Sequence, residues 1–185
     1  MFVLNVELLN KVALARGVKE VNDKLNCVYV WDDAGKRNYM ATNGHILFWA
    51  KDEIQDTDGK IEGRLALQWE GKIKHNKHER GALVNIEPSG LGTIRTVKED
   101  KRVIDAKIDP PENWLKCIPA RDSEKLEKYT LFNPQYLGYV REFIGDYYFT
   151  RPQTLSNEGN WNPVVWYCGD DKIAVIMPMR LERGE

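Results

Sequence analysis

The sequence has no long apolar run. None of its apolar stretches approaches the roughly 18 residues that a membrane-spanning helix needs, so we expect no membrane segment in the 185 residues. Residues 1–5 lack the basic start and apolar core of a signal peptide, which predicts a cytoplasmic protein. An excess of charge of one sign is missing too, since the net charge is −1. Any contact with nucleic acid therefore requires a local basic patch rather than overall attraction.

Cysteine and histidine are too scarce and too scattered for a disulfide framework or a metal site. The three cysteines are an odd number and widely spaced, which predicts reduced thiols in or near the core: Cys27, Cys117 and Cys168. His75 and His78 lie three residues apart, but no cysteine or carboxylate cluster completes a ligand set, so the prediction is a solvated basic loop. We therefore expect no metal and no cofactor.

Signatures of catalysis are absent as well. The sequence contains no G-x-S-x-G, no phosphate-binding Walker loop and no dinucleotide fingerprint. Two pairs of neighbouring carboxylates, Asp52-Glu53 and Asp170-Asp171, fall in predicted turns, where acidic residues serve the local backbone. The sequence thus predicts a binding protein and not an enzyme.

One pattern is present near each end of the chain: a strand, a capped helix and three further strands. Near the start, Asn5 caps a helix that we expect to end at Gly17. Near the end, Asn133 and Pro134 begin a helix that Gly145 stops. The strands predicted around the two helices cover residues 2–4, 26–31, 37–42 and 45–50, then 129–132, 147–150, 163–167 and 172–178.

The stretch between these two units has no helical period. Short apolar segments separated by Gly, Pro and charge predict strands over residues 65–69, 82–86, 93–97 and 103–108. Pro110-Pro111 breaks the chain, and residues 113–118 predict a short turn of helix. Residues 32–35 and Asn43-Gly44 are predicted turns between strands. Helices packed on antiparallel strands make the predicted fold class α+β.

The predicted core consists of the apolar faces of the two helices and of the strands beside them. Its expected members are Leu8, Leu9, Val12, Val28, Val30, Leu137, Val140, Phe143, Val165 and Ile173. Four tryptophans fall inside predicted strands and are expected to pack on the sheet: Trp31, Trp49, Trp69 and Trp166. Trp114 and Trp161 fall in loops, and the sequence assigns them no partner.

Two segments stand out from this ordinary pattern. Residues 39–47 read Tyr-Met-Ala-Thr-Asn-Gly-His-Ile-Leu, and residues 174–181 read Ala-Val-Ile-Met-Pro-Met-Arg-Leu. Pro178 cannot donate to a strand ladder, so it leaves two flexible methionines beside a rigid kink, a composition that suits adaptable apolar binding. The alternative is an edge strand that carries a core methionine.

These two segments resemble the bacterial beta sliding clamp, the beta subunit of DNA polymerase III. That family carries Ala-Thr-Asp-Gly-His-Arg-Leu in its middle domain and ends in Met-Pro-Met-Arg-Leu, similar to residues 41–47 and 177–181 here. Asn43 replaces the acidic residue and Ile46 the basic one. Residues 108–119 are similar to the segment that leads to a domain end in the family. The resemblance implies a DNA-clamp-like fold.

In the family the two motifs line a groove that binds short peptides of DNA polymerases and of the clamp loader. Carried over by position, the peptide-binding residues here are Thr42, Gly44, His45, Leu47, Val175, Met177, Pro178, Met179 and Leu181. Clamp helices also present cations to DNA, and the candidates on the two predicted helices are Lys11 and Arg141. The implied partners are such peptide motifs, duplex DNA and further copies of the chain in a ring, with no membrane.

The length leaves two domain divisions open, since a clamp subunit has three domains and this chain is too short for three. One is a single clamp-type domain over 1–185, with halves at about 1–50 and 125–181 and a β insertion at about 51–121. The other is two degenerate clamp domains, 1–120 and 121–185. Two functions stay open as well. The first is a processivity factor or scaffold from a short or partial relative, with a phage as one source. The second is a clamp-fold adaptor or mimic that regulates replication without encircling DNA.

Overall fold

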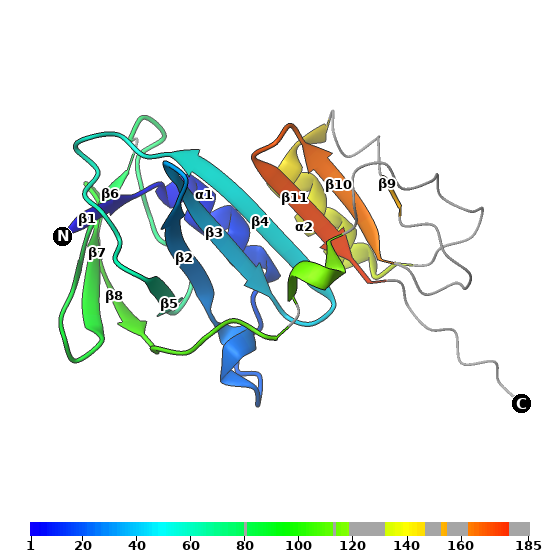
Figure 1. Ribbon diagram of the computed structural model, residues 1–185, viewed down its shortest axis with the longest axis horizontal. Helices are drawn as coiled ribbons and strands as arrows, with labels where there is room; N and C mark the ends of the chain where they lie inside the picture. The colour runs from blue at the N-terminus through cyan, green and yellow to red at the C-terminus, as the bar shows by residue number, and fades with distance from the viewer. Residues whose placement is uncertain (80, 113, 119–131, 147–152, 155–162, 178–185) are drawn as a thin grey trace, which may run out of the picture.

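One antiparallel sheet runs through the whole described chain (Figure 1). The computed structural model describes residues 1–79, 81–112, 114–118, 132–146, 153–154 and 163–177. The sheet has 11 strands in the order β1-β6-β7-β8-β5-β2-β3-β4-β11-β10-β9. The strands are β1 Phe2–Leu4, β2 Val28–Asp33, β3 Lys36–Thr42, β4 Ile46–Glu53, β5 Arg64–Gln68, β6 Ala82–Ile86, β7 Leu91–Arg95, β8 Asp100–Asp105, β9 Gln153–Thr154, β10 Val164–Cys168 and β11 Lys172–Ile176. The predicted α+β class, with helices packed on antiparallel strands, is confirmed.

The first helix, α1 (Val6–Val12), begins where the sequence predicted. The side chain of Asn5 accepts a hydrogen bond from the Leu8 amide at 3.0 Å, which satisfies one of the free N–H groups of the first turn. The predicted end at Gly17 is wrong, because the chain tightens into a 3₁₀ turn over Ala13–Ala15 and then becomes extended at Arg16. Gly17 serves a close approach instead: its N–H donates to Leu25 O at 2.6 Å, and a Cβ there would lie 3.2 Å from that oxygen.

The second helix, α2 (Pro134–Ile144), confirms the prediction at both ends. Asn133 accepts from the Gln135 amide at 3.0 Å, and Pro134 takes a position whose N–H has no helical partner. Gly145 ends the helix with φ of 86°, and its N–H donates to Arg141 O at 2.9 Å. Two shorter 3₁₀ segments lie elsewhere, η2 (Asp23–Asn26) and η3 (Trp114–Cys117), the latter inside the helical turn predicted over 113–118.

The two predicted turns differ in mechanism. Asp32 and Asp33 belong to β2, so the β2–β3 loop is only Ala34-Gly35, with φ of 48° and 78°. Positive φ at both positions is the backbone of the tight hairpin turn that matches strand twist. At Asn43-Gly44 only Gly44 has positive φ, 87°. Asn43 acts through its side chain, which accepts from the amides of His45 and Ile46 at 2.9 and 3.0 Å.

The four strands predicted in the middle of the chain are confirmed and belong to the same sheet. β6 pairs with β1, β5 pairs with β2, and β7 and β8 lie between β6 and β5 (Figure 1). β7 and β8 begin two and three residues earlier than predicted, because the two strands pair with each other from Leu91 to Arg95 and from Asp100 to Ile104. The division into one or two domains stays a prediction. Of the predicted strand at 129–132 only Phe132 is described, and it is not in a strand; the predicted strand at 147–150 lies outside the described residues.

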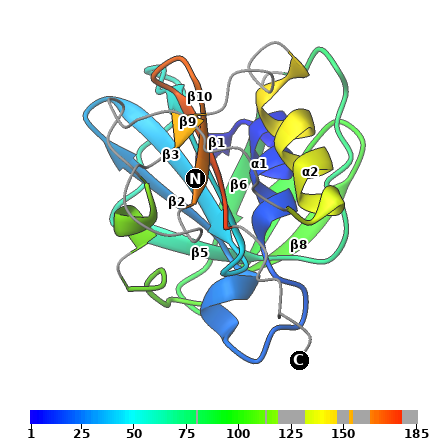
Figure 2. The same ribbon diagram turned by 90° about the vertical axis from the view of Figure 1, so that its right-hand side faces the viewer.

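The sheet has a core on each face. Figure 2 shows α1 and α2 on one side of β2 and β3 and the short helix η3 on the other. On the helix side, Phe143 of α2 stacks on Phe48 of β4 with ring centroids 4.4 Å apart. The cluster on the opposite side, which we call the outer core, consists of Cys27, Tyr29, Met40, Leu47, Ala66, Val165 and Val175.

Most of the predicted core residues are buried. Leu8, Leu9, Val12, Val28, Val30, Val140, Phe143 and Val165 are buried, whereas Leu137 and Ile173 are only partly so. Trp69 and Trp166 are buried as expected, and Trp31 and Trp49 are partly buried on the outer face. Cys27 is a buried free thiol whose pKa is raised by burial, Cys168 is free and partly buried, and the side chain of Cys117 lies outside the described residues.

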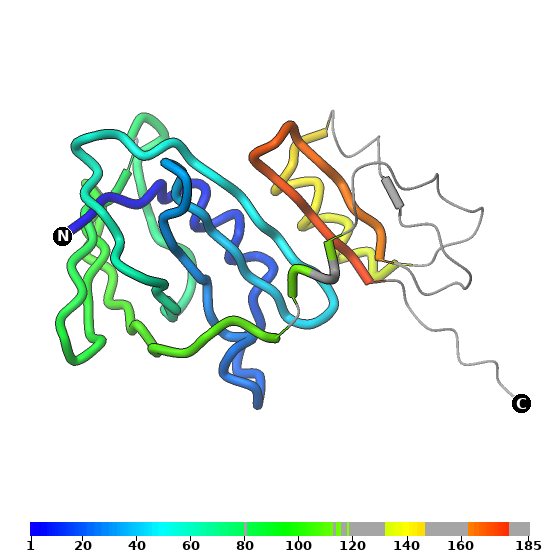
Figure 3. The backbone as a smooth tube through the Cα atoms, viewed as in Figure 1, coloured from blue at the N-terminus to red at the C-terminus, as the bar shows by residue number. Residues whose placement is uncertain are grey.

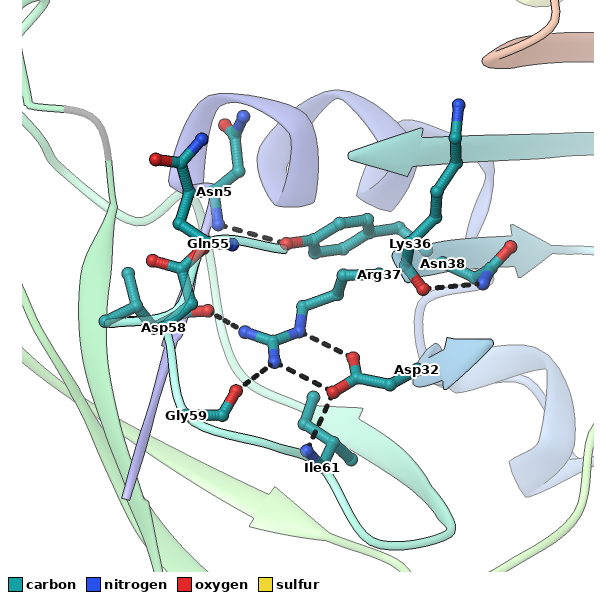
Figure 4. A network of polar contacts seen from close by, with 11 residues as sticks. Asn5, Asp32, Lys36, Arg37, Asn38, Gln55, Asp58, Gly59 and Ile61 are labelled. Atoms are coloured by element: carbon teal, nitrogen blue, oxygen red, sulfur yellow. Dashed lines mark hydrogen bonds and ion pairs between the residues drawn. The ribbon is translucent and has the colours of Figure 1, made fainter. Parts of the chain in front are cut away.

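A buried ion pair covers the open side of β1 (Figure 4). The Arg37 guanidinium contacts both carboxylate oxygens of Asp32, at 2.8 and 3.0 Å, and donates to Gly59 O at 2.7 Å and to Val3 O. Asp32 also accepts from the Ile61 amide at 2.8 Å. Edge strands carry unpaired carbonyls, and here a side chain from β3 satisfies one of them.

Candidate functional site

The two unusual segments of the sequence lie side by side. β4 and β11 pair antiparallel, with Leu47 opposite Val175 and Ile46 opposite Ile176. Figure 3 shows the cyan strand β4 beside the red strand β11. The Met177 amide donates to His45 O at 2.8 Å, so the pairing continues one residue past β11. We call this junction the seam. The predicted meeting of residues 42–47 with 175–177 is confirmed, whereas Pro178, Met179 and Leu181 lie outside the described residues.

The turn at the start of the seam is rigidly hydrogen-bonded. The Thr42 hydroxyl is buried, donates to Ile46 O at 2.7 Å and accepts from the Gly44 amide at 3.1 Å. His45 is exposed, and its ring stacks on Tyr136 of α2 with centroids 6.2 Å apart. Asn43 Nδ2 also donates to the Tyr136 hydroxyl at 3.4 Å. The turn therefore leans toward the helix side of the sheet, not toward the outer core that contains Leu47.

The apolar residues predicted as peptide anchors are more buried than an open groove requires. Leu47 is 4% exposed and Val175 2%, and both belong to the outer core. Trp114 and Ile118 pack against that cluster. Met177 is 37% exposed at the end of the seam. The structure thus brings together those of the predicted residues that it describes, and among the apolar ones Met177 exposes its side chain to solvent.

An aromatic group on the outer face was missed by sequence reasoning. The Trp114 ring meets Trp49 and Trp31 edge-on, with centroids 5.5 and 5.9 Å apart. Lys51 Nζ lies 4.7 Å above the Trp49 ring, and the Arg64 guanidinium 5.1 Å above Trp31. The available signal was Trp114 and Ile118 at helical spacing directly after Pro110-Pro111. It did not say which surface they cover.

The two predicted DNA-binding cations are both tied in ion pairs. Lys11 Nζ lies 2.8 Å from a Glu7 carboxylate oxygen, and the same contact lowers the pKa of Glu7. Arg141 pairs with Asp146, just past the end of α2. Their role toward DNA stays a prediction, and the pairing leaves less of their charge for a phosphate.

The helix side also has a wide concavity of about 1590 Å³, to which α1 and α2 both contribute. Its lining includes Arg16, Lys72, Lys101 and Arg102, and within the described ranges none of these four has a carboxylate in ion-pair distance. The Arg16 guanidinium lies 4.2 Å above the ring of Trp69, and burial lowers the pKa of Arg16. An arginine stays protonated at any physiological pH, so Arg16 is a positive charge held in place over an aromatic face.

Three of the four carboxylates considered as catalytic pairs have other partners. Lys36 Nζ joins Glu53 at 3.1 Å and Asp171 at 2.7 Å, and Asp52 accepts from Asn5 at 3.1 Å. Over the part of the chain that the structure describes, no three His, Cys, Asp or Glu side chains are grouped closely enough to hold a metal ion. None of the described helices is long and apolar enough to cross a membrane.

The comparison with solved structures decides the fold. The chain superposes on the DNA polymerase III beta subunit of Thermotoga maritima with a TM-score of 0.65 at 15% identity, covering 97% of this chain and 65% of that one. The sliding clamp of Pseudomonas aeruginosa gives 0.67 at 14% identity, covering 97% and 66%. The Caulobacter crescentus polymerase III beta subunit gives 0.66 at 15%, again covering 97% and 66%. The chain has the fold of a bacterial beta sliding clamp.

The likeness is structural. No protein-family model and no curated protein matches the sequence. The chain spans only 65 to 66% of the length of the clamp subunits just named. At this identity the match establishes the clamp fold, and the activity and the partners are matters for proposal.

Proposed function

We propose that the protein is a sliding-clamp-type scaffold that binds short apolar peptide motifs of DNA polymerase or clamp-loader partners at the seam. The observation that supports it is the pairing of Leu47 with Val175, which joins the two clamp-like motifs into one surface. Thr42, Gly44 and His45 form a fixed turn at its end, and Met177 presents a flexible apolar side chain beside it. A preorganised turn next to an adaptable methionine suits a small peptide anchor.

Affinity for such a peptide should be modest. Only a few side chains are buried when a short peptide binds, and their contribution barely exceeds the free energy of ordering the peptide. We expect a Kd on the order of 10⁻⁵ M for a peptide with a Leu–Phe anchor. Isothermal titration or fluorescence anisotropy with a labelled peptide measures this directly.

The methionines provide the test of this site. Met177→Ala and Met179→Ala should each weaken peptide binding by about 1–2 kcal/mol with little change in the midpoint of thermal unfolding, because interface anchors contribute more to binding than to folding. Leu91→Ala is the matched control, since Leu91 is an exposed apolar residue of β7. Variants that unfold more readily yet bind as before would make both methionines ordinary core residues and overturn the proposal.

The same scaffold is compatible with two arrangements, a ring on DNA and an adaptor that does not encircle DNA. Four cations of the concavity have no carboxylate partner among the described residues, and they support the ring. The net charge of −1 and the pairing of Lys11 and Arg141 support the adaptor. The solution mass distinguishes them. A closed trimer or larger ring supports a processivity factor, and a monomer or dimer supports an adaptor or mimic.

Binding of open linear duplex DNA is the second measurement on this point. With a near-neutral chain, we expect a Kd no tighter than about 10⁻⁶ M near physiological salt, measured by mobility shift. Tight binding would assign the concavity a larger role in DNA contact than its charge predicts.

A further inference from the structure

The outer face of the sheet is covered in part by the chain itself. We call residues 106–112 and 114–118 the strap. Trp114 and Ile118 of the strap pack on the outer core, to which Leu47 and Val175 belong. Figure 1 shows the green helix η3 in front of the junction of β4 and β11, and Figure 2 places it on the side away from α1 and α2. A segment of this chain therefore packs on the outer side of the seam, the side on which Leu47 and Val175 lie.

The strap is attached to the sheet at its beginning and packed on it afterwards. The Ala106 amide donates to Ala66 O at 2.9 Å, and the Tyr29 hydroxyl lies 3.3 Å from Asp109 O. From residue 110 onward, no hydrogen bond or ion pair joins the described strap residues to the described sheet. The turn at η3 is closed locally, with the Ile118 amide donating to Leu115 O at 3.1 Å. Release of residues 114–118 would expose apolar surface of the outer core but would break none of the described hydrogen bonds between strands.

The occupant itself shows what chemistry the face accepts. Trp114 and Ile118 lie four residues apart across a short helical turn, and both contact the outer core. Leu115, between them in sequence, is 56% exposed. An aromatic and an aliphatic anchor one helical turn apart is the pattern by which short helical peptides dock on apolar surfaces.

We propose that the strap is a built-in competitor of the peptide site, and that a partner peptide binds the outer face by displacing Trp114. This proposal rests on the proposed function and adds how that site is regulated: the apolar anchors of the partner peptide compete with Trp114 and Ile118 for the outer core. The apparent affinity for a partner is the intrinsic affinity multiplied by the fraction of molecules in which the strap has left the sheet.

Removing the indole tests the displacement. A Trp114→Ala protein should bind the Leu–Phe peptide at least about 10-fold more tightly than the unchanged protein, because the open fraction rises. Leu115→Ala is the matched control, and its affinity should stay that of the unchanged protein because Leu115 faces solvent. Equal or weaker binding by Trp114→Ala would show that Trp114 is inert toward the peptide or a wall of its site, and would overturn the proposal.

A second probe is a synthetic peptide with the sequence of residues 108–119 and serine in place of its cysteine. It should bind the Trp114→Ala protein, and the same peptide with alanine in place of tryptophan should not. Binding of this peptide without any binding of the Leu–Phe peptide would reject the proposed function and leave the self-docking intact. Equal affinity of the Leu–Phe peptide for the unchanged protein and for Trp114→Ala would reject the competition by the strap and leave the proposed function intact.

Hydrogen exchange on the unchanged protein tests the displacement without a substitution, so the result does not depend on whether a variant folds. Saturating Leu–Phe peptide should speed the exchange of the strap amides, while exchange in β7 and β8 stays constant. Slower exchange of the strap on binding would mean that the peptide packs on top of it, and the displacement would be wrong.

Discussion

Two hairpins of the sheet carry the same cross-strand ion pair in opposite environments. In β2–β3, Asp32 lies directly opposite Arg37, and in β7–β8, Arg95 lies opposite Asp100. The side chains of Arg37 and Asp32 are 3% and 7% exposed, whereas those of Arg95 and Asp100 are 66% and 54% exposed. The cross-strand pairing alone therefore does not determine how much a salt bridge contributes to the stability of the fold. The surroundings do, since the buried pair also binds the carbonyls of Val3 and Gly59.

Neutralising each arginine should give the largest difference in stability between the two hairpins. Arg37→Met leaves Asp32 buried without its cation and frees the carbonyl of β1, so we expect the free energy of unfolding to fall by about 3–5 kcal/mol. The matched Arg95→Met change removes a solvated pair and should leave the unfolding midpoint nearly unchanged. Urea denaturation followed by circular dichroism measures both. Equal effects would mean that burial does not decide the contribution of the pair.

Replacing both partners of the buried pair sharpens the same comparison. Asp32→Leu combined with Arg37→Met leaves no unpaired charge and should restore part of the stability lost in Arg37→Met. Recovery should be incomplete, by about 1–2 kcal/mol, because the Ile61 amide and the Gly59 carbonyl lose their partners. A double variant as unstable as the single one would show that the loss of the carbonyl contacts, and not the unpaired carboxylate of Asp32, accounts for most of the lost stability.

The turns of the two hairpins differ as well. The β7–β8 turn is held by Thr96, which is buried and whose hydroxyl donates to Lys74 O at 2.8 Å while the amides of Lys98 and Glu99 donate to it. Thr96→Ala removes these bonds and should lower the free energy of unfolding by about 1–2 kcal/mol. Thr93→Ala is the matched control within β7 and should have a smaller effect in the same denaturation assay.

The β2–β3 turn should respond in the opposite direction. Ala34 has φ of 48°, a conformation in which a Cβ is crowded by the following carbonyl. Ala34→Gly relieves this strain, and we expect a gain of about 0.5–1 kcal/mol after the added flexibility of glycine in the unfolded chain is subtracted. An unchanged or lower thermal midpoint would show that the turn accommodates alanine without strain.

Local signals predicted the helix starts and most strands. Asn5 and Asn133 cap helices because their partners are only two or three residues away in the sequence. The end of α1 was predicted wrongly, since the close contact of Gly17 with Leu25 depends on a loop that folds back. Likewise, the resemblance identified the residues of the seam, but it gave no sign that Trp114 would pack on the outer core to which Leu47 and Val175 belong.

The sequence by itself determined where helices begin, which segments become strands, and which two motifs define the candidate site. These features depend on hydrogen bonds between near neighbours and on the alternation of apolar residues. Only the tertiary structure decided that Arg37 completes the edge of β1, that Lys11 and Arg141 are paired, and that the strap lies over the seam. Each of these depends on which face of the sheet a side chain meets, and that is set by residues far away in the chain.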